Sequence, residues 1–108
     1  MSGFDRRREG FEGKFALDEE QKFKAVMRRD KLVGLWAAEK LGLAGAAAEE
    51  YAVTVAKSDL KEPGDNDIIT KIATDFAARG LSISDDAIRA ELDRRMHEAA
   101  AQILGHAD

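Results

Sequence analysis

Apolar residues near the carboxyl end of the chain recur at helical spacing. Ile88, Leu92, Met96, Ala99 and Ile103 follow one another at steps of four, four, three and four. Side chains with this spacing lie on one face of an α-helix, which leaves the charged residues between them on the other faces. The pattern predicts an amphipathic helix that packs one side against a core.

The residues before this stripe mark where the helix begins. Ser84 is a favourable N-cap, because its hydroxyl can accept a hydrogen bond from a free backbone N–H of the first turn. Ile83 and Ile88 flank the cap at the spacing of a hydrophobic staple. We therefore expect the last helix to start at Ser84.

A long helix is expected earlier in the chain, from Asp18 to Gly42. Asp18 is a good N-cap, Gln21 stands where a capping-box partner belongs, and Gly42 is a typical C-terminal stop. Its inward residues are predicted to be Phe23, Val26, Met27, Val33, Trp36 and Ala37.

Two shorter helices fill the middle of the chain. The first, roughly Ala44 to Lys57, is rich in alanine and should let neighbouring helices approach closely. A turn at Glu62–Asp65 follows, with Asp65 placed to cap the next helix, which ends at about Arg79 before Gly80. The inward residues expected here are Ala48, Tyr51, Ala52, Val55, Ile68, Ile69, Ile72 and Phe76. Residues 18–108 are thus predicted to form an all-α, up-and-down four-helix bundle.

Length and composition limit what else the chain can be. With 108 residues it is expected to be a single domain. It has no cysteine, which excludes disulfides and thiolate metal sites and is typical of a reducing cytosol. Apolar runs are only a few residues long, so we expect neither a membrane span nor a signal peptide.

Charge argues against nucleic acid as a partner. The net charge is −4, yet residues 1–15 alone carry +1. A broad phosphate-binding surface requires an excess of basic residues that this chain lacks. The short basic clusters Arg6–Arg8, Arg28–Arg29 and Arg94–Arg95 are better explained as members of charge pairs on solvated helix faces.

The first 17 residues do not fit the bundle. Phe4, Phe11 and Phe15 would share one helical face, but glycines at positions 3, 10 and 13 interrupt the stretch. Each interior glycine costs about 1 kcal/mol relative to alanine, and isolated helices shorter than about 12–15 residues are marginal. We expect this N-terminal segment (residues 1–17) to be disordered until a partner surrounds it and it folds as a helix. A frayed tail, or a helix folded back onto the bundle, remains the alternative.

Several stretches of the chain resemble the zeta-subunit family of alphaproteobacterial F-type ATP synthases. The Phe-x-x-Lys-Phe-Ala pattern and the Gly-Leu-Trp-Ala-Ala-Glu run are the most specific of them. The similarity is carried by Phe4-Asp5, Arg8-Glu9, Phe11-Glu12, Lys14-Phe15-Ala16, Phe23-Lys24-Ala25, Arg28-Arg29, Gly34–Glu39 and Glu62–Asp65. It extends over nearly the whole chain.

The resemblance implies an ATPase inhibitor subunit. In that family a four-helix bundle carries a mobile N-terminal segment, which becomes helical in the catalytic head, near the rotor stalk, and blocks ATP hydrolysis. The partner-binding positions that carry over are Phe4, Asp5, Arg8, Glu9, Phe11, Glu12, Lys14 and Phe15. The sequence departs from the family pattern at Arg6, Gly10, Gly13 and Leu17. The implied location is the cytoplasm, at the cytoplasmic face of the inner membrane through the synthase.

Other functions have weaker support in the sequence. The resemblance implies weak ATP or ADP binding by the bundle, but there is no phosphate-binding glycine loop, so no cofactor is assigned. No catalytic or metal site is expected, because the sequence has no His-x-x-x-His or Glu-x-x-His pair, and a metal site at His97 or His106 would need carboxylates brought close by the fold. Asp30, the one charge in an otherwise apolar helical face, is interpreted as a helix-end or surface carboxylate. The alternative function is a structural or assembly subunit, or a nucleotide-sensing bundle, that docks through its helices without inhibiting.

Overall fold

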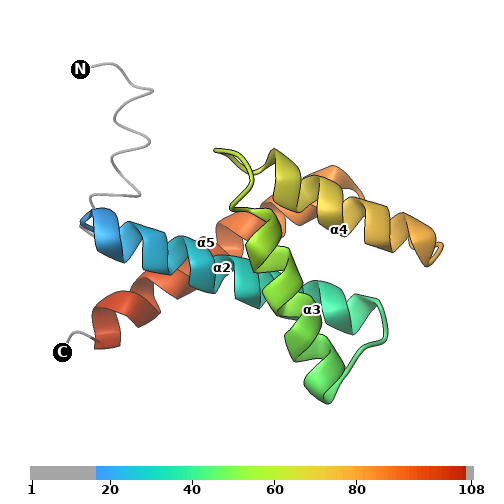
Figure 1. Ribbon diagram of the computed structural model, residues 1–108, viewed down its shortest axis with the longest axis horizontal. Helices are drawn as coiled ribbons and strands as arrows, with labels where there is room; N and C mark the ends of the chain where they lie inside the picture. Colours follow the sequence, from blue (N-terminus) through green and yellow to red (C-terminus); the bar gives the residue numbers. More distant parts are fainter. Residues whose placement is uncertain (1–16, 107–108) are drawn as a thin grey trace.

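The computed structural model describes residues 17–106, with only the backbone of His106. This part of the chain forms four α-helices and no strand (Figure 1). The helices are α2 (Glu19–Lys40), α3 (Gly45–Ser58), α4 (Asn66–Ala78) and α5 (Asp85–His106). The predicted all-α four-helix bundle is confirmed.

α2 is the central helix. It packs against both α3 and α5, and these two contacts are the most extensive between any two helices of the structure. The first turns of α2 and the last turns of α5 lie at the same end of the molecule, whereas α3 crosses α2 obliquely (Figure 1). Among the helices of residues 17–106, none has the length and apolar character needed to cross a membrane.

The ends of α2 are set by the residues that the sequence indicated. The Asp18 carboxylate accepts from the Gln21 backbone N–H at 2.7 Å, and the Gln21 side chain accepts from the Asp18 N–H at 3.1 Å. This is a complete capping box. At the other end Gly42 has a φ of +82°, a left-handed conformation that favours glycine.

The start of α5 is also confirmed. The Ser84 hydroxyl accepts from the Ala87 N–H at 3.1 Å, which satisfies one N–H of the first turn. Ile88 is buried in the core, and Ile83 packs against the same cluster. α5 then runs from Asp85 to the end of the described chain.

Two local predictions need correction. Asp65 occupies the N-cap position of α4, but its side chain makes no capping hydrogen bond. Its carboxylate accepts instead from the guanidinium of Arg29 at 2.9 Å. Phe23, expected to face inward, is 57% exposed, because it lies in the first turns of α2, where its side chain borders open pockets rather than the core.

The core lies where the four helices meet. It is lined by Val33, Ala37, Leu41, Val55, Ile68, Ile69, Ile72, Phe76, Ile88 and Leu92. Trp36 is half-buried at its edge, where its ring meets that of Phe76 edge to face with centroids 5.7 Å apart. Trp36, expected to face inward, thus packs against the edge of the core while staying partly exposed.

Small residues let α2 and α3 approach closely, as the alanine-rich sequence of α3 predicted. A Cβ atom on Gly34 would lie 2.7 Å from the Cα of Ala52 and 3.2 Å from the Cβ of Val55. These distances are shorter than a van der Waals contact between carbon atoms. Only glycine at position 34 allows this helix crossing.

Candidate functional site

The partner-binding residues predicted from the sequence lie outside the described part of the chain. All eight fall within residues 1–16. The description begins at Leu17 and Asp18, immediately before α2. Which of the eight come together therefore stays a prediction.

A capping box closes the N-terminal end of α2 at Asp18. Asp18 has extended backbone angles, with φ −82° and ψ −179°. Its side chain accepts a hydrogen bond from the Gln21 backbone N–H in the first turn. A helix that continued without a break from the N-terminal segment into α2 would have to abandon both hydrogen bonds of the box. A cap of this kind stabilises a helix end by about 1 kcal/mol.

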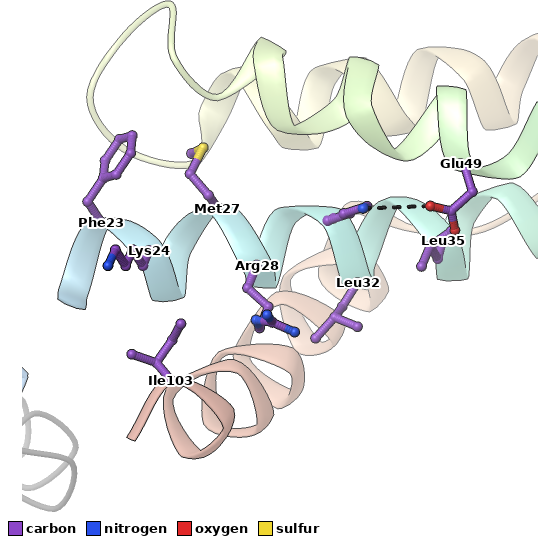
Figure 2. Close-up of a pocket in the computed structure, with 9 residues that line it drawn as sticks. Phe23, Lys24, Met27, Arg28, Leu32, Leu35, Glu49 and Ile103 are labelled. Atoms are coloured by element: carbon purple, nitrogen blue, oxygen red, sulfur yellow. Dashed lines mark ion pairs between the residues drawn. The ribbon is translucent and has the colours of Figure 1, made fainter. Parts of the chain in front are cut away.

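A groove begins one turn beyond this cap (Figure 2). It has a volume of about 550 Å³ and runs along α2 from Phe23 to Leu35, with one residue each from the end of α5 (Ile103) and from α3 (Glu49). We call it the α2–α5 groove. It is lined by Phe23, Lys24, Met27, Arg28, Lys31, Leu32, Leu35, Glu49 and Ile103.

The groove has an apolar floor and a mostly basic rim. Met27, Leu32, Leu35 and Ile103 are half-buried, and Figure 2 shows Arg28 and Leu32 on the side of α2 that faces α5. Three cations and one carboxylate line it, which makes the rim positive although the whole chain is negative. Apolar floors with a few convergent polar groups are typical of binding sites.

The charged groups of the rim are held loosely. Lys31 pairs with Glu49 of α3 at 3.6 Å, and both side chains are at least half exposed. Arg28 donates to the neutral amide oxygen of Gln102 at 3.1 Å. Exposed ion pairs of this kind contribute only about 0–1 kcal/mol, so a ligand can replace them at little cost.

A second hollow, of about 320 Å³, adjoins the groove at Phe23 and Met27. Its other apolar residues are Val26 and Leu60, and the Leu60 side chain is 59% exposed. Phe23 therefore stands between two apolar depressions near the start of α2. Exposed apolar side chains grouped in this way typically mark an interaction surface.

A buried ion cluster lies on another face of α2. Asp30 has no exposed surface, and Arg29 is only 8% exposed. The Arg29 guanidinium contacts Asp30 at 2.8 Å, Asp65 at 2.9 Å and Asp59 at 3.4 Å. Three carboxylates thus share one cation, and the interpretation of Asp30 as a helix-end or surface carboxylate is wrong.

The cluster perturbs the ionisation of both α2 residues. Burial, and then the carboxyl group of Asp59, raise the pKa of Asp30 to about 8. As a carboxylate, Asp30 would leave its Oδ2 without a hydrogen-bond partner. Burial lowers the pKa of Arg29, but the charges of Asp30 and Asp65 more than offset this, so its pKa is raised and the guanidinium stays charged.

The other basic clusters differ in their surroundings. Arg95 of α5 pairs with Glu91 at 2.7 Å and with Glu98 at 2.9 Å, and Arg94 also pairs with Glu91. Charge pairs on solvated helix faces were predicted here, and the pairs form within α5, although their shared partner Glu91 is buried. The prediction is wrong for Arg29, which is buried and serves the fold. Within residues 17–106 no group of three or more His, Asp or Glu side chains is arranged to hold a metal ion.

Sequence reasoning missed the groove and the partners of Asp30. The embedded charge of Asp30 was the one available signal for the cluster. The groove left a weaker signal, because Phe23, Met27 and Leu35 repeat at steps of four and eight among basic residues. That pattern equally fits a core-facing stripe.

A family model identifies the family to which the chain belongs. No curated protein matches it. One solved structure, determined in solution by NMR, is 38% identical, with a TM-score of 0.70 over 79% of this chain and 96% of that one. The family model described as ATPase inhibitor subunit zeta matches residues 1–102, which include all eight predicted partner-binding positions. The chain belongs to the zeta family of ATPase inhibitor subunits.

Proposed function

We propose that this protein inhibits ATP hydrolysis by an F-type ATP synthase by inserting its N-terminal segment, as a helix, into the catalytic head. The observation that carries the proposal is the family match, which includes the N-terminal segment as well as the bundle. The insertion site lies between the two large subunit types, near the rotor stalk. The protein would then act in the cytoplasm, at the membrane face where the synthase sits.

The chemistry of the segment suits this role. Phe4, Phe11 and Phe15 share one helical face and would fill apolar pockets between the catalytic subunits. Arg8 and Lys14 would pair with carboxylates of the head. The acidic positions Asp5, Glu9 and Glu12 would pair with basic groups.

The energetics require a partner that encloses the segment. Ordering a backbone residue costs about 1–2 kcal/mol, whereas burying a phenylalanine contributes about 1.5–3 kcal/mol. Three rings alone therefore do not offset the ordering of more than a dozen residues. A deep interface that also pairs the charged side chains supplies the remainder.

The capping box supports treating residues 1–17 and 18–108 as separate units. α2 completes its own N-terminus at Asp18 and needs nothing from the preceding chain to do so. The bundle can then keep its fold whether or not the segment is inserted. Residues 18–108 are accordingly proposed to be the carrier of the inhibitory segment.

Titration of the cognate synthase with purified protein tests the proposal. The full chain should inhibit ATP hydrolysis, and a full-length variant with Phe4, Phe11 and Phe15 replaced by serine should inhibit at least about a hundredfold more weakly. That factor corresponds to about 3 kcal/mol, a fraction of the burial energy of three rings. A protein truncated to residues 18–108 should not inhibit while keeping its helical circular dichroism.

The α2–α5 groove favours a second function, docking through the bundle as a structural or assembly subunit. In that case the truncated protein and the serine variant would bind the synthase as the full chain does, and none of the three would change its rate of hydrolysis. Equal inhibition by all three proteins would contradict insertion of the N-terminal segment.

A further inference from the structure

The α2–α5 groove has the length of a short helix. The residues that α2 contributes run from Phe23 to Leu35, about three turns, or roughly 18 Å along the helix axis. A small compact ligand would use only part of such a groove. A peptide segment lying along α2 would use all of it.

The apolar floor needs an apolar stripe to cover it. Met27, Leu32, Leu35 and Ile103 are half-buried, and the adjoining Phe23 is 57% exposed. Amphipathic helices bind such grooves with anchors spaced by three, four and seven residues. Burial of a ring such as that of Phe23 is the kind of contact that dominates an interface.

The charges decide which helix fits. Lys24, Arg28 and Lys31 line the groove with one acidic residue, Glu49, so its rim carries a net positive charge. Arg28 is held by a neutral amide, and the pair of Lys24 with Glu20 at 3.3 Å is exposed on both sides. Carboxylates beside an apolar stripe would complement this rim.

The same charges disfavour the two occupants supplied by this chain itself. A symmetric dimer through this face would bring two positive rims together, because a two-fold axis pairs each surface with itself. Residues 1–15 carry a net charge of +1, the same sign as the rim. Neither occupant has the complementary charge.

We propose that the α2–α5 groove binds an acidic amphipathic helix of the synthase, as a second contact besides the N-terminal segment. This inference rests on the proposed function. The groove begins five residues after Asp18, so insertion of the preceding segment brings its basic rim against the surface of the catalytic head. A weak contact there strengthens inhibition, because the inserted segment holds it at high effective concentration.

Charge reversal in the full-length protein tests the contact. The inhibition constant is measured with the purified catalytic head for the wild type, Arg28→Glu, Lys24→Glu and the control Lys40→Glu. Lys40 is exposed at the far end of α2 and does not line the groove. Arg28→Glu and Lys24→Glu should each weaken inhibition about tenfold at low salt and less at high salt, while Lys40→Glu should match the wild type. Both groove residues are exposed, and helical circular dichroism checks that the variants fold.

The outcomes separate this inference from the proposed function. If the wild type does not inhibit, the proposed function fails. If the wild type inhibits and the groove variants behave like Lys40→Glu, the groove contact alone is overturned.

A photo-crosslinking amino acid at position 23 identifies the occupant. Crosslinking to a synthase helix that carries several carboxylates supports the proposal. Crosslinking to residues 1–17, to a second copy of this chain, or to a segment without carboxylates would overturn it.

Discussion

Replacing Asp30 by asparagine should make the free energy of unfolding less dependent on pH. Asp30 is fully buried beside Asp59 and shares the single guanidinium of Arg29 with two other carboxylates. Burial and the neighbouring Asp59 raise its pKa to about 8. A protonated Asp30 can donate to Asp59, and asparagine can do the same without binding a proton.

The sign follows from proton binding in the two states. An aspartate of the unfolded chain titrates near pH 3.9, whereas folded Asp30 keeps its proton up to about pH 8. Between these values the folded protein binds one more proton than the unfolded chain. The contribution of Asp30 to stability is therefore fully present below about pH 4 and is lost as the pH rises towards 8.

The magnitude is large for a protein of this size. A fully shifted group changes the free energy of unfolding by about 1.4 kcal/mol per pH unit. Asp65, the partly exposed member of the cluster, admits water and weakens the effect. We expect the wild type to lose about 2 kcal/mol from this site between pH 5 and pH 7, and Asp30→Asn to lose none there.

Urea denaturation followed by circular dichroism at pH 5, 6, 7 and 8 measures the effect. The free energy of unfolding of Asp30→Asn minus that of the wild type should become more positive as the pH rises. Its dependence on urea concentration should not change. Asp93→Asn, at an exposed aspartate of α5, controls for the loss of one negative charge. If this signed difference stays constant from pH 5 to pH 8, or becomes less positive as the pH rises, the proposed protonation of Asp30 is refuted.

Two further changes test the packing of the bundle and the N-terminal segment. Gly34→Ala should lower the free energy of unfolding, measured in urea, by about 1–3 kcal/mol, because the new Cβ would lie 2.7 Å from the Cα of Ala52 and the gain in helix propensity is only about 1 kcal/mol. Unchanged stability would contradict the close crossing of α2 and α3. Gly105→Ala, where the added Cβ meets open space on α5, is the control. Alanine at both Gly10 and Gly13 should strengthen inhibition up to about thirtyfold, or about 2 kcal/mol, if both are helical when bound; an unchanged or weaker inhibition constant would count against an inserted helix.

Local signals in the sequence predicted the fold well. The start of α2 depends on Asp18 and Gln21, three residues apart, and both hydrogen bonds form as expected. The end of α2 depends on Gly42, whose positive φ is a local requirement. α3 begins one residue later than expected, at Gly45, where no side chain caps the helix.

Contacts between distant residues explain what could not be predicted. Asp65 is a residue type favoured at N-caps and follows a Pro-Gly turn, but a guanidinium 36 residues earlier in the chain binds its carboxylate. Asp30 could be recognised as unusual, yet the Asp59 beside it comes from the loop after α3. Phe23 fits an inward stripe by spacing, yet in the folded chain it is exposed beside two open pockets.

Three consecutive residues of α2 show why stability and binding can be changed separately. Successive residues of an α-helix point about 100° apart. Arg28 therefore lines the groove, Arg29 reaches the carboxylates of the loop after α3, and Asp30 is fully buried. Arg28→Glu alters only a solvent-exposed rim, whereas Asp30→Asn alters a group that no partner can touch. The first change should therefore act mainly on inhibition and the second mainly on unfolding.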